Sequence, residues 1–285
     1  MKRAAQLAVG VLAGSLFGTL GFANSADAMT LVNTELILSI DTSSSVNDVV
    51  PGTGKTEYQL QIEGYINAFN SAVIRDRIKS LSNGVAVGVN TWGSMLNNSA
   101  VGNFFHLTDD DSITTFINNA LNPLLGGSGL GGTNIASGIN DGVNALLNND
   151  FQGYRLVIDV SGDGKQNVFA GCRPAFTETA VCTSLVTAAR DNAIANGITI
   201  NGLPILTDFP DLDTYYTDYV IGGDKRFLIA ASDFPDFASA VEQKIEREIA
   251  PPDSESTPEP TSLLGLGFVS LIGAAAALKR KQRDI

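Results

Sequence analysis

The amino-acid sequence predicts an α/β fold with a doubly wound, mostly parallel sheet and helices on both faces. Short apolar, β-branched runs alternate along the chain with longer segments whose apolar residues recur every three to four positions. Two of the strand-like runs are followed directly by an acidic residue, Asp41 and Asp163. Ligands bind open α/β sheets at such strand ends, so the pattern indicates both a fold class and a location for a site.

The expected strands are apolar runs bounded by polar or glycine-containing segments. Residues 36–40 form the first, and residues 85–89 alternate in the way a strand does. Residues 102–107 could pair with this second strand as an antiparallel neighbour. Further strands are expected at residues 154–160, 198–203 and 226–230.

The expected helices carry apolar residues on one face. Asp109 or Asp110 could cap the second of them, and Asn196-Gly197 ends the fourth. The five helices are expected at residues 55–78, 111–121, 133–147, 183–195 and 234–249.

The composition excludes one class of partner. The chain has 285 residues, with 30 acidic against 18 basic side chains and a formal net charge of −12. Nucleic-acid binding needs clustered Lys and Arg, so no nucleic-acid partner is expected. Removing the two terminal segments described below leaves about 225 residues, enough for one sizeable core.

Oxygen-bearing side chains gather after the first strand. Asp41, Ser43 and Ser45 are spaced by two residues, so one carboxylate and two hydroxyls can turn toward a single point. An all-oxygen cluster suits a hard cation, Mg²⁺ first, with Ca²⁺ or Mn²⁺ possible. The alternative is that these hydroxyls only cap turns or helices.

Two more segments could complete this cluster. Gly131-Gly132-Thr133 opens a helical stretch, where the glycines allow close backbone approach, and Asp163 follows the strand at residues 154–160. Asp-x-Ser-x-Ser, a Gly-Gly-Thr helix start and an Asp after a central strand occur in this order, which resembles the metal-ion-dependent adhesion site of von Willebrand factor type A domains. The resemblance covers roughly residues 34 to 247.

The resemblance implies roles for the five residues. Ser43, Ser45 and Thr133 would contact the metal, and Asp41 and Asp163 would bind it directly or through water. One coordination position would remain for a carboxylate from a partner. Within the family, the stretch from Glu57 to Phe69 resembles a bacterial secreted subgroup that has no assigned function.

The amino-terminal residues 1–28 resemble a secretory signal peptide. A basic start, an apolar stretch from about Leu7 to Phe22 and the small residues of Ala26-Asp27-Ala28 occur in the usual order. Cleavage after Ala28 would leave a main domain at residues 29–250.

The carboxyl-terminal end has a comparable organisation. A polar linker at residues 251–257 precedes Pro258-Glu259-Pro260, an apolar run at residues 263–278 and a basic cluster. Residues 258–285 therefore resemble a PEP-CTERM sorting signal, which implies processing by an exosortase; the alternative is a plain membrane anchor. Either interpretation predicts an exported domain in the cell envelope, on the cell surface or in the extracellular matrix, anchored in the cytoplasmic membrane transiently or stably.

The two cysteines fit such a location. Cys172 and Cys182 are ten positions apart, and in an oxidising compartment we expect them to form a disulfide. Zinc ligation is the alternative, but two Cys with no nearby His make a poor zinc site.

Signals for catalysis are weak. Residues 51–56 resemble the end of a phosphate-binding loop, yet Val49 stands where its first Gly would be. His106 is the only histidine and has no recognisable nucleophile partner. Asp208, Asp211 and Asp213 could form a second Ca²⁺ site or a solvated loop.

The sequence thus predicts an exported binding module rather than an enzyme. It would capture an acidic group of an unknown protein or acidic polysaccharide through a divalent cation. A metal-assisted hydrolase is one alternative, although no general base besides Asp163 is evident. A structural matrix protein whose metal only stabilises the fold is the other.

Overall fold

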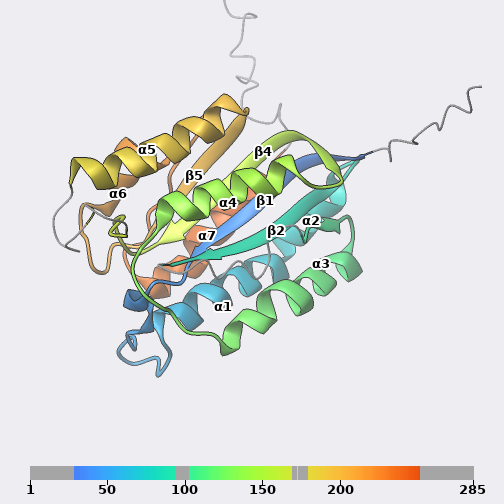
Figure 1. The fold of residues 1–285 in the computed structure, drawn as a ribbon. Helices are drawn as coiled ribbons and strands as arrows, with labels where there is room; N and C mark the ends of the chain where they lie inside the picture. The colour runs from blue at the N-terminus through green and yellow to red at the C-terminus, as the bar shows by residue number, and fades with distance from the viewer. Residues whose placement is uncertain (1–28, 94–102, 169–171, 173–178, 251–285) are drawn as a thin grey trace, which may run out of the picture.

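A computed structural model describes residues 29–93, 103–168, 172 and 179–250. Its centre is a five-stranded sheet with the order β3-β2-β1-β4-β5 (Figure 1). All neighbours are parallel except the edge pair of β2 and β3. The predicted α/β class with a mostly parallel sheet is confirmed. The strands are β1 (Thr30–Asp41), β2 (Val85–Trp92), β3 (Phe105–Leu107), β4 (Phe151–Gly162) and β5 (Ile198–Pro204).

Helices cover both faces of the sheet (Figure 1). One apolar layer packs α1, α2, α3 and α7 on one face of the sheet, and the other packs α4, α5 and α6 on the opposite face, with β1, β2, β4 and β5 contributing to both. Strands β1 and β2 are buried almost throughout, because each lies between two helical layers. The helices are α1 (Glu57–Asn70), α2 (Ala72–Ser80), α3 (Asp110–Phe116), α4 (Ile135–Leu147), α5 (Ala180–Ala195), α6 (Leu212–Tyr215) and α7 (Phe234–Glu248).

The strand register aligns the carboxyl ends of three strands at one edge of the sheet. Asp41 lies opposite Trp92 of β2, and Ile40 lies opposite Ser161 of β4. The residues that follow β1 and β4 are therefore neighbours in space although about 120 positions separate them. We call this edge, where β1, β2 and β4 end, the metal edge, after the metal site that the sequence predicts there.

Two predicted elements differ from the observed ones. The helix expected at residues 55–78 is broken at Ser71, whose backbone is extended (ψ 147°) and whose side chain caps α2 by accepting from the Ile74 N–H. The strand expected at residues 226–230 is reduced to isolated bridges, such as Leu228 with Gly202 and Ala231 with Ile205. Apolar content alone does not secure a strand at the end of a sheet, where only one neighbour is available.

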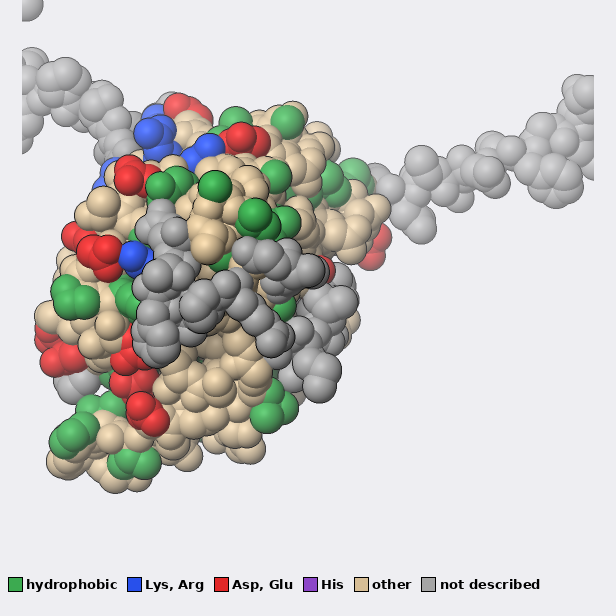
Figure 2. Space-filling model, turned by 60° about the vertical axis from the view of Figure 1, so that its left-hand side comes forward, with side chains coloured by type: hydrophobic (Ala, Val, Ile, Leu, Met, Phe, Trp, Pro, Cys, Tyr) green, Lys and Arg blue, Asp and Glu red, His purple; other side chains and the backbone are tan. Residues whose placement is uncertain are grey.

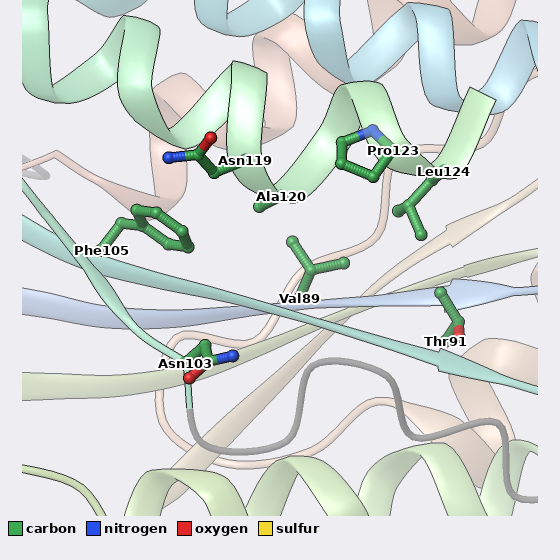
Figure 3. Close-up of a pocket in the computed structure, with 8 residues that line it drawn as sticks. All are labelled: Val89, Thr91, Asn103, Phe105, Asn119, Ala120, Pro123 and Leu124. Atoms are coloured by element: carbon green, nitrogen blue, oxygen red, sulfur yellow. The ribbon is translucent and has the colours of Figure 1, made fainter. Parts of the chain in front are cut away.

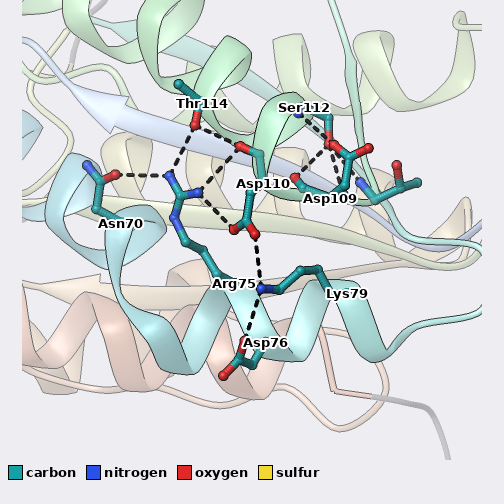
Figure 4. Close-up of polar contacts among 9 residues, drawn as sticks. Asn70, Arg75, Asp76, Lys79, Asp109, Asp110, Ser112 and Thr114 are labelled. Carbon is teal, nitrogen blue, oxygen red and sulfur yellow. Dashed lines mark hydrogen bonds and ion pairs between the residues drawn. The ribbon is translucent and has the colours of Figure 1, made fainter.

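The region around α3 is held by an exposed ion network (Figure 4). Arg75 and Lys79 of α2 both contact the Asp110 carboxylate, at 3.0 and 3.1 Å. Asp109, one of the two caps expected from the sequence, accepts a 2.8 Å hydrogen bond from the Ser112 N–H. These contacts lie away from the metal edge and fix α3 against α2.

A second ion network is completely buried beneath α7. Lys244 Nζ lies 2.5 Å from Asp159 Oδ1 of β4 and 2.6 Å from Glu248 Oε1, and all three side chains have no exposed surface. Asn201 of β5 donates to the same Glu248 oxygen at 2.9 Å. Burial, with the charge of Asp159 second, raises the pKa of Glu248 to about 7. Helix α7 is thereby attached to β4 through the ion pair of Lys244 with Asp159 and to β5 through the Asn201 amide.

A cavity of about 140 Å³ lies beside the edge of β2 (Figure 3). Its lining carries no ionisable side chain, so it offers neither a general acid nor a strong metal ligand. The lining residues are Val89, Thr91, Asn103, Phe105, Asn119, Ala120, Pro123 and Leu124.

The predicted signal peptide (residues 1–28), linker (251–257) and sorting signal with its apolar run (258–285) all lie outside the described residues. In the part of the chain that is described, no helix has the length and apolar character needed to span a membrane.

Candidate metal centre

Three loops bring the five predicted ligands to the metal edge. The first loop follows β1: the Ser43 N–H donates to Asp41 Oδ1 at 2.7 Å and turns the chain back over the strand end. Ser43 Oγ then lies 3.0 Å from Ser45 Oγ, and Ser45 Oγ donates to Asp163 Oδ1 at 2.9 Å. The two hydroxyls therefore lie between the carboxyl groups of β1 and β4.

The second loop carries Thr133. Helix α4 begins only at Ile135, and Asn134 rather than Thr133 caps it. The Thr133 hydroxyl lies against Gly164, where an added Cβ would come within 2.9 Å of Thr133 Oγ1. This places Thr133 beside Asp163, which precedes Gly164 on the third loop. Ser43 also makes no capping bond through its side chain, so neither of these hydroxyls serves a helix.

Both carboxylates are buried. Asp41 and Asp163 have no exposed surface, while Ser43 is 1% and Thr133 3% exposed. Gly162 allows this approach, because a Cβ there would come within 2.7 Å of Asp41 Oδ2. Below the loop, Gln61 of α1 donates to the Asp41 carbonyl at 2.9 Å and accepts from Ser161 of β4.

The electrostatics of this pair favour a cation. Burial first, and then the charge of Asp163, raises the pKa of Asp41 well above its usual range. Burial likewise raises the pKa of Asp163 to about 6, with Asp208 contributing repulsion. Asp41 Oδ2 and Asp163 Oδ2 receive no hydrogen bond from any amide, hydroxyl or amine of the described residues. Adjacent buried carboxylates with free lone pairs are costly without a counter-ion, and a divalent cation would compensate both.

The donor set fits a hard metal ion. It consists of two carboxylates and three hydroxyls, all oxygen, as Mg²⁺ prefers. No group of three or more His, Cys, Asp or Glu in metal-binding geometry occurs among residues 29–93, 103–168, 172 and 179–250. Of the five predicted ligands at the metal edge, only Asp41 and Asp163 can carry a charge. They would supply two negative charges to a bound ion.

A clamp that the sequence did not reveal holds Thr133. The Asn167 side chain accepts from the Thr133 N–H at 2.9 Å and donates to Thr133 Oγ1 at 3.3 Å. Gly132 makes room for it, since a Cβ there would lie 2.4 Å from Asn167 Oδ1. The neighbouring Gln166 side chain accepts from the Ala136 N–H and donates to Asn134. The glycine pair expected to admit a ligand thus also admits this amide.

The predicted disulfide lies just beyond the clamp. Cys172 and Cys182 are bonded with a Cα–Cα distance of 5.0 Å. Cys182 belongs to the first turn of α5, which is capped by Thr179. The bridge ties Cys172 to α5. Because both sulfurs are used in the disulfide, they are not available as zinc ligands.

A third set of contacts locks the loop after β1 to residues 129–131. Asn47 bonds Gly129 twice, donating to its carbonyl at 2.8 Å and accepting from its N–H at 2.7 Å. The Leu130 N–H donates to the Thr42 carbonyl at 2.7 Å. Gly131 has a positive φ of 74°, and its carbonyl accepts from the backbone and the side chain of Ser44. Ser43 and Ser45 therefore sit on a loop with a fixed path.

Glu57 is a further acidic group that sequence reasoning missed. It is 9% exposed in the first turn of α1, and its N–H donates to the Asp48 carbonyl at 2.9 Å. Burial, followed by the charges of Asp163, Asp208 and Asp48, raises the pKa of Glu57 to about 8. The only sequence signal for it is the charge itself, because its position depends on how the loop at residues 48–56 returns.

The weaker candidates occupy structural positions. His106 Nε2 lies 2.9 Å from the Asn83 carbonyl, and its ring packs edge-on against Phe151. The segment resembling a phosphate-binding loop ends at Thr56, whose side chain caps α1. In the acidic loop, Asp211 pairs with Lys165 at 2.8 Å.

Replacing Asn167 by alanine is expected to lower the affinity for Mg²⁺ by about 10- to 100-fold, the usual effect of removing a group that orients a ligand. Thr133 would lose the partners of its N–H and of its hydroxyl together. Isothermal titration of MgCl₂ measures the change, with the exposed Asn144→Ala as control. Equal affinities in the two variants would show that Asn167 does not orient Thr133.

The fold is shared with domains of surface proteins. The PilB minor pilin from Streptococcus sanguinis superposes with a TM-score of 0.52 at 12% identity, covering 78% of this chain and 62% of that one. The pilus adhesin SpaC from Lactobacillus rhamnosus GG gives 0.52 at 11% identity over 76% of this chain and 30% of its own. The vWF domain of the type V pili tip protein Mfa5 from Porphyromonas gingivalis gives 0.50 at 12% identity, over 76% and 96%.

These likenesses establish a von Willebrand factor A-like fold and no more, since all identities are low. The chain spans 62% of the PilB chain that it matches. No curated protein matches it in sequence. A family model does match, over residues 31–253, which is most of the chain. The chain accordingly belongs to the family described as "Protein of unknown function (DUF1194)".

Proposed function

We propose that this chain is an exported adhesion module that captures a partner's carboxylate through a divalent cation, Mg²⁺ first, with Ca²⁺ or Mn²⁺ as substitutes. One observation carries the proposal: two fully buried, adjacent carboxyl groups share the metal edge with three hydroxyls, and each keeps one oxygen that accepts no hydrogen bond among the described residues. The pilus proteins with similar folds are described as a minor pilin, an adhesin and a tip protein, which supports this class of function.

The five predicted ligands would bind the ion in two ways. Asp41 and Asp163 would balance the two charges of the ion, and Ser43, Ser45 and Thr133 would supply neutral oxygens. With no third carboxylate among these five ligands, the bound ion remains attractive to an anionic group from outside. Gln61 and Asn167 hold Asp41 and Thr133 in place from behind. The disulfide suits an oxidising location, which supports export.

The test is a titration of the purified protein with MgCl₂, followed by a short peptide containing one Glu. We expect one Mg²⁺ per chain and peptide binding that EDTA abolishes. Asp41→Ala and Thr133→Val should each lower the Mg²⁺ affinity at least tenfold, since each removes a direct donor. Thr217→Val, an exposed threonine far from the metal edge in sequence and contacts, serves as control. Unchanged affinity in both site variants would refute the proposal.

The same experiment separates the alternatives. A metal that raises the melting temperature while EDTA leaves peptide binding intact would indicate a purely stabilising ion. Turnover of a substrate that is lost in Glu57→Gln would instead indicate a hydrolase, because a carboxyl with a pKa of about 8 suits a general acid or base.

A further inference from the structure

The metal edge carries more negative charge than a divalent ion can balance. Three acidic residues lie near the five ligands, namely Asp48, Glu57 and Asp208, and we call them the rim. Asp48 is three residues after Ser45 and is exposed, and its carbonyl accepts from the Glu57 N–H at 2.9 Å. Asp208, also exposed, follows Ile205, whose N–H donates to the Gly162 carbonyl at 3.0 Å beside Asp163.

The rim groups are close enough to affect one another. Burial and the charge of Asp48 raise the pKa of Asp208, and Asp208 in turn opposes ionisation of Asp163. Since Asp41 and Asp163 together match the charge of a divalent ion, the exposed carboxylates of Asp48 and Asp208 stay uncompensated after the ion binds. Two side chains that could attract anions, Lys55 and Lys165, are already paired with Glu63 and Asp211, at 2.7 and 2.8 Å.

Figure 2 turns this side of the molecule toward the viewer. In Figure 2, acidic side chains gather on the left of the face, and the larger groups of basic side chains lie at its top. A ligand approaching the metal edge therefore meets a negative potential around a single positive ion. A polyanion would be attracted by the ion but repelled by the rim. A carboxylate flanked by cations would be attracted by both, through its carboxylate and its cations respectively.

We propose, resting on the proposed function, that the metal-bound carboxylate belongs to a protein segment in which the acidic residue is flanked by Lys or Arg. Asp48 and Asp208, as exposed carboxylates near the ion, would contact the flanking cations. Acidic polysaccharides, with a negative charge on each sugar unit, are disfavoured by the same groups. The buried, unpaired oxygens of Asp41 and Asp163 mark the position of the ion that the ligand's carboxylate would bind.

The experiment compares four probes on the full-length protein in Mg²⁺. Three are peptides with one central Glu, flanked on both sides by Lys, by Gly or by Asp, and the fourth is a polyuronate. We expect the Lys-flanked peptide to bind about tenfold tighter than the Gly-flanked one at low salt, with the difference shrinking at high salt. The Asp-flanked peptide and the polyuronate should bind more weakly than the Gly-flanked peptide.

Variants assign the preference to the rim. The pair Asp48→Asn and Asp208→Asn should bring the Lys-flanked and Gly-flanked peptides to similar affinities. The pair Asp150→Asn and Asp224→Asn, two exposed acids outside the rim, makes the same change in net charge and should retain the preference.

The outcomes distinguish the two proposals. Mg²⁺-dependent binding of all peptides with equal affinity, or tighter binding of the polyuronate, overturns the partner assignment and leaves the metal-dependent function standing. Binding that EDTA does not affect, or no binding of any peptide, removes the proposed function and the partner assignment together.

Discussion

Replacing Lys244 by methionine is expected to lower the free energy of unfolding by about 3–5 kcal/mol, the usual cost of leaving a buried charge without its partner. Lys244 is the cation between Asp159 and Glu248, all three fully buried. Methionine keeps most of the side chain's volume, so the loss would come from electrostatics rather than from a cavity. Urea unfolding followed by the fluorescence of Trp92, the single tryptophan, measures it.

Lys79→Met is the matched control. Lys79 also contacts two carboxylates, Asp76 and Asp110, each at 3.1 Å, but these groups are exposed (Figure 4). Exposed ion pairs contribute little, so this variant should unfold close to the wild-type midpoint. If both variants lost the same stability, burial would not be what makes the Lys244 network important.

Replacing Gly129 by alanine is expected to reduce Mg²⁺ affinity by about a hundredfold and to cost about 1–3 kcal/mol of stability, as overpacking does. The new Cβ would stand 1.9 Å from the Ser43 carbonyl oxygen, so the backbone at Ser43 has to move by about an ångström to reach normal contact. The pair of Asn47 bonds to Gly129 resists that movement. Any displacement shifts Ser43 and Ser45 relative to Asp163.

Gly126→Ala supplies the comparison, because nothing lies within 4 Å of a Cβ at that position and its φ is not in the left-handed region. It should bind Mg²⁺ as the wild type does. Titration with MgCl₂ and a urea unfolding curve for each variant test both parts. Wild-type metal affinity in Gly129→Ala would mean that the path of the loop after β1 does not set the ligand geometry.

Sequence reasoning succeeded where the determinants are local. Asp41 and Asp163 follow apolar runs, and the parallel order of β1 and β4 brings strand ends together wherever such runs pair. The helix expected from Thr133 begins two residues later, at Ile135, because Asn134 is the capping residue. The helix break at Ser71 is not predictable from the sequence, because an isolated serine is compatible with both a helix interior and a cap.

The remaining site residues could not be predicted, because they act across loops. Asn167 reaches Thr133 across 34 positions, and its role depends on the missing side chain of Gly132. Glu57 comes near Asp163 only after the chain has returned through the loop at residues 48–56. Such contacts leave no periodicity or spacing in the sequence, since they are set by the packing of the sheet and helices around them.

The strand register has a consequence for orientation. Thr30 lies opposite Phe151, and Arg155, four residues into β4, donates to the carbonyl of Ala250, the last described residue. Both ends of the folded body therefore leave from the side opposite Asp41: Thr30 is about 36 Å away along β1, and the contact with Ala250 is roughly 20–25 Å away along β4. A tether at either end would leave the proposed cation-binding end of the body pointing away from the point of attachment.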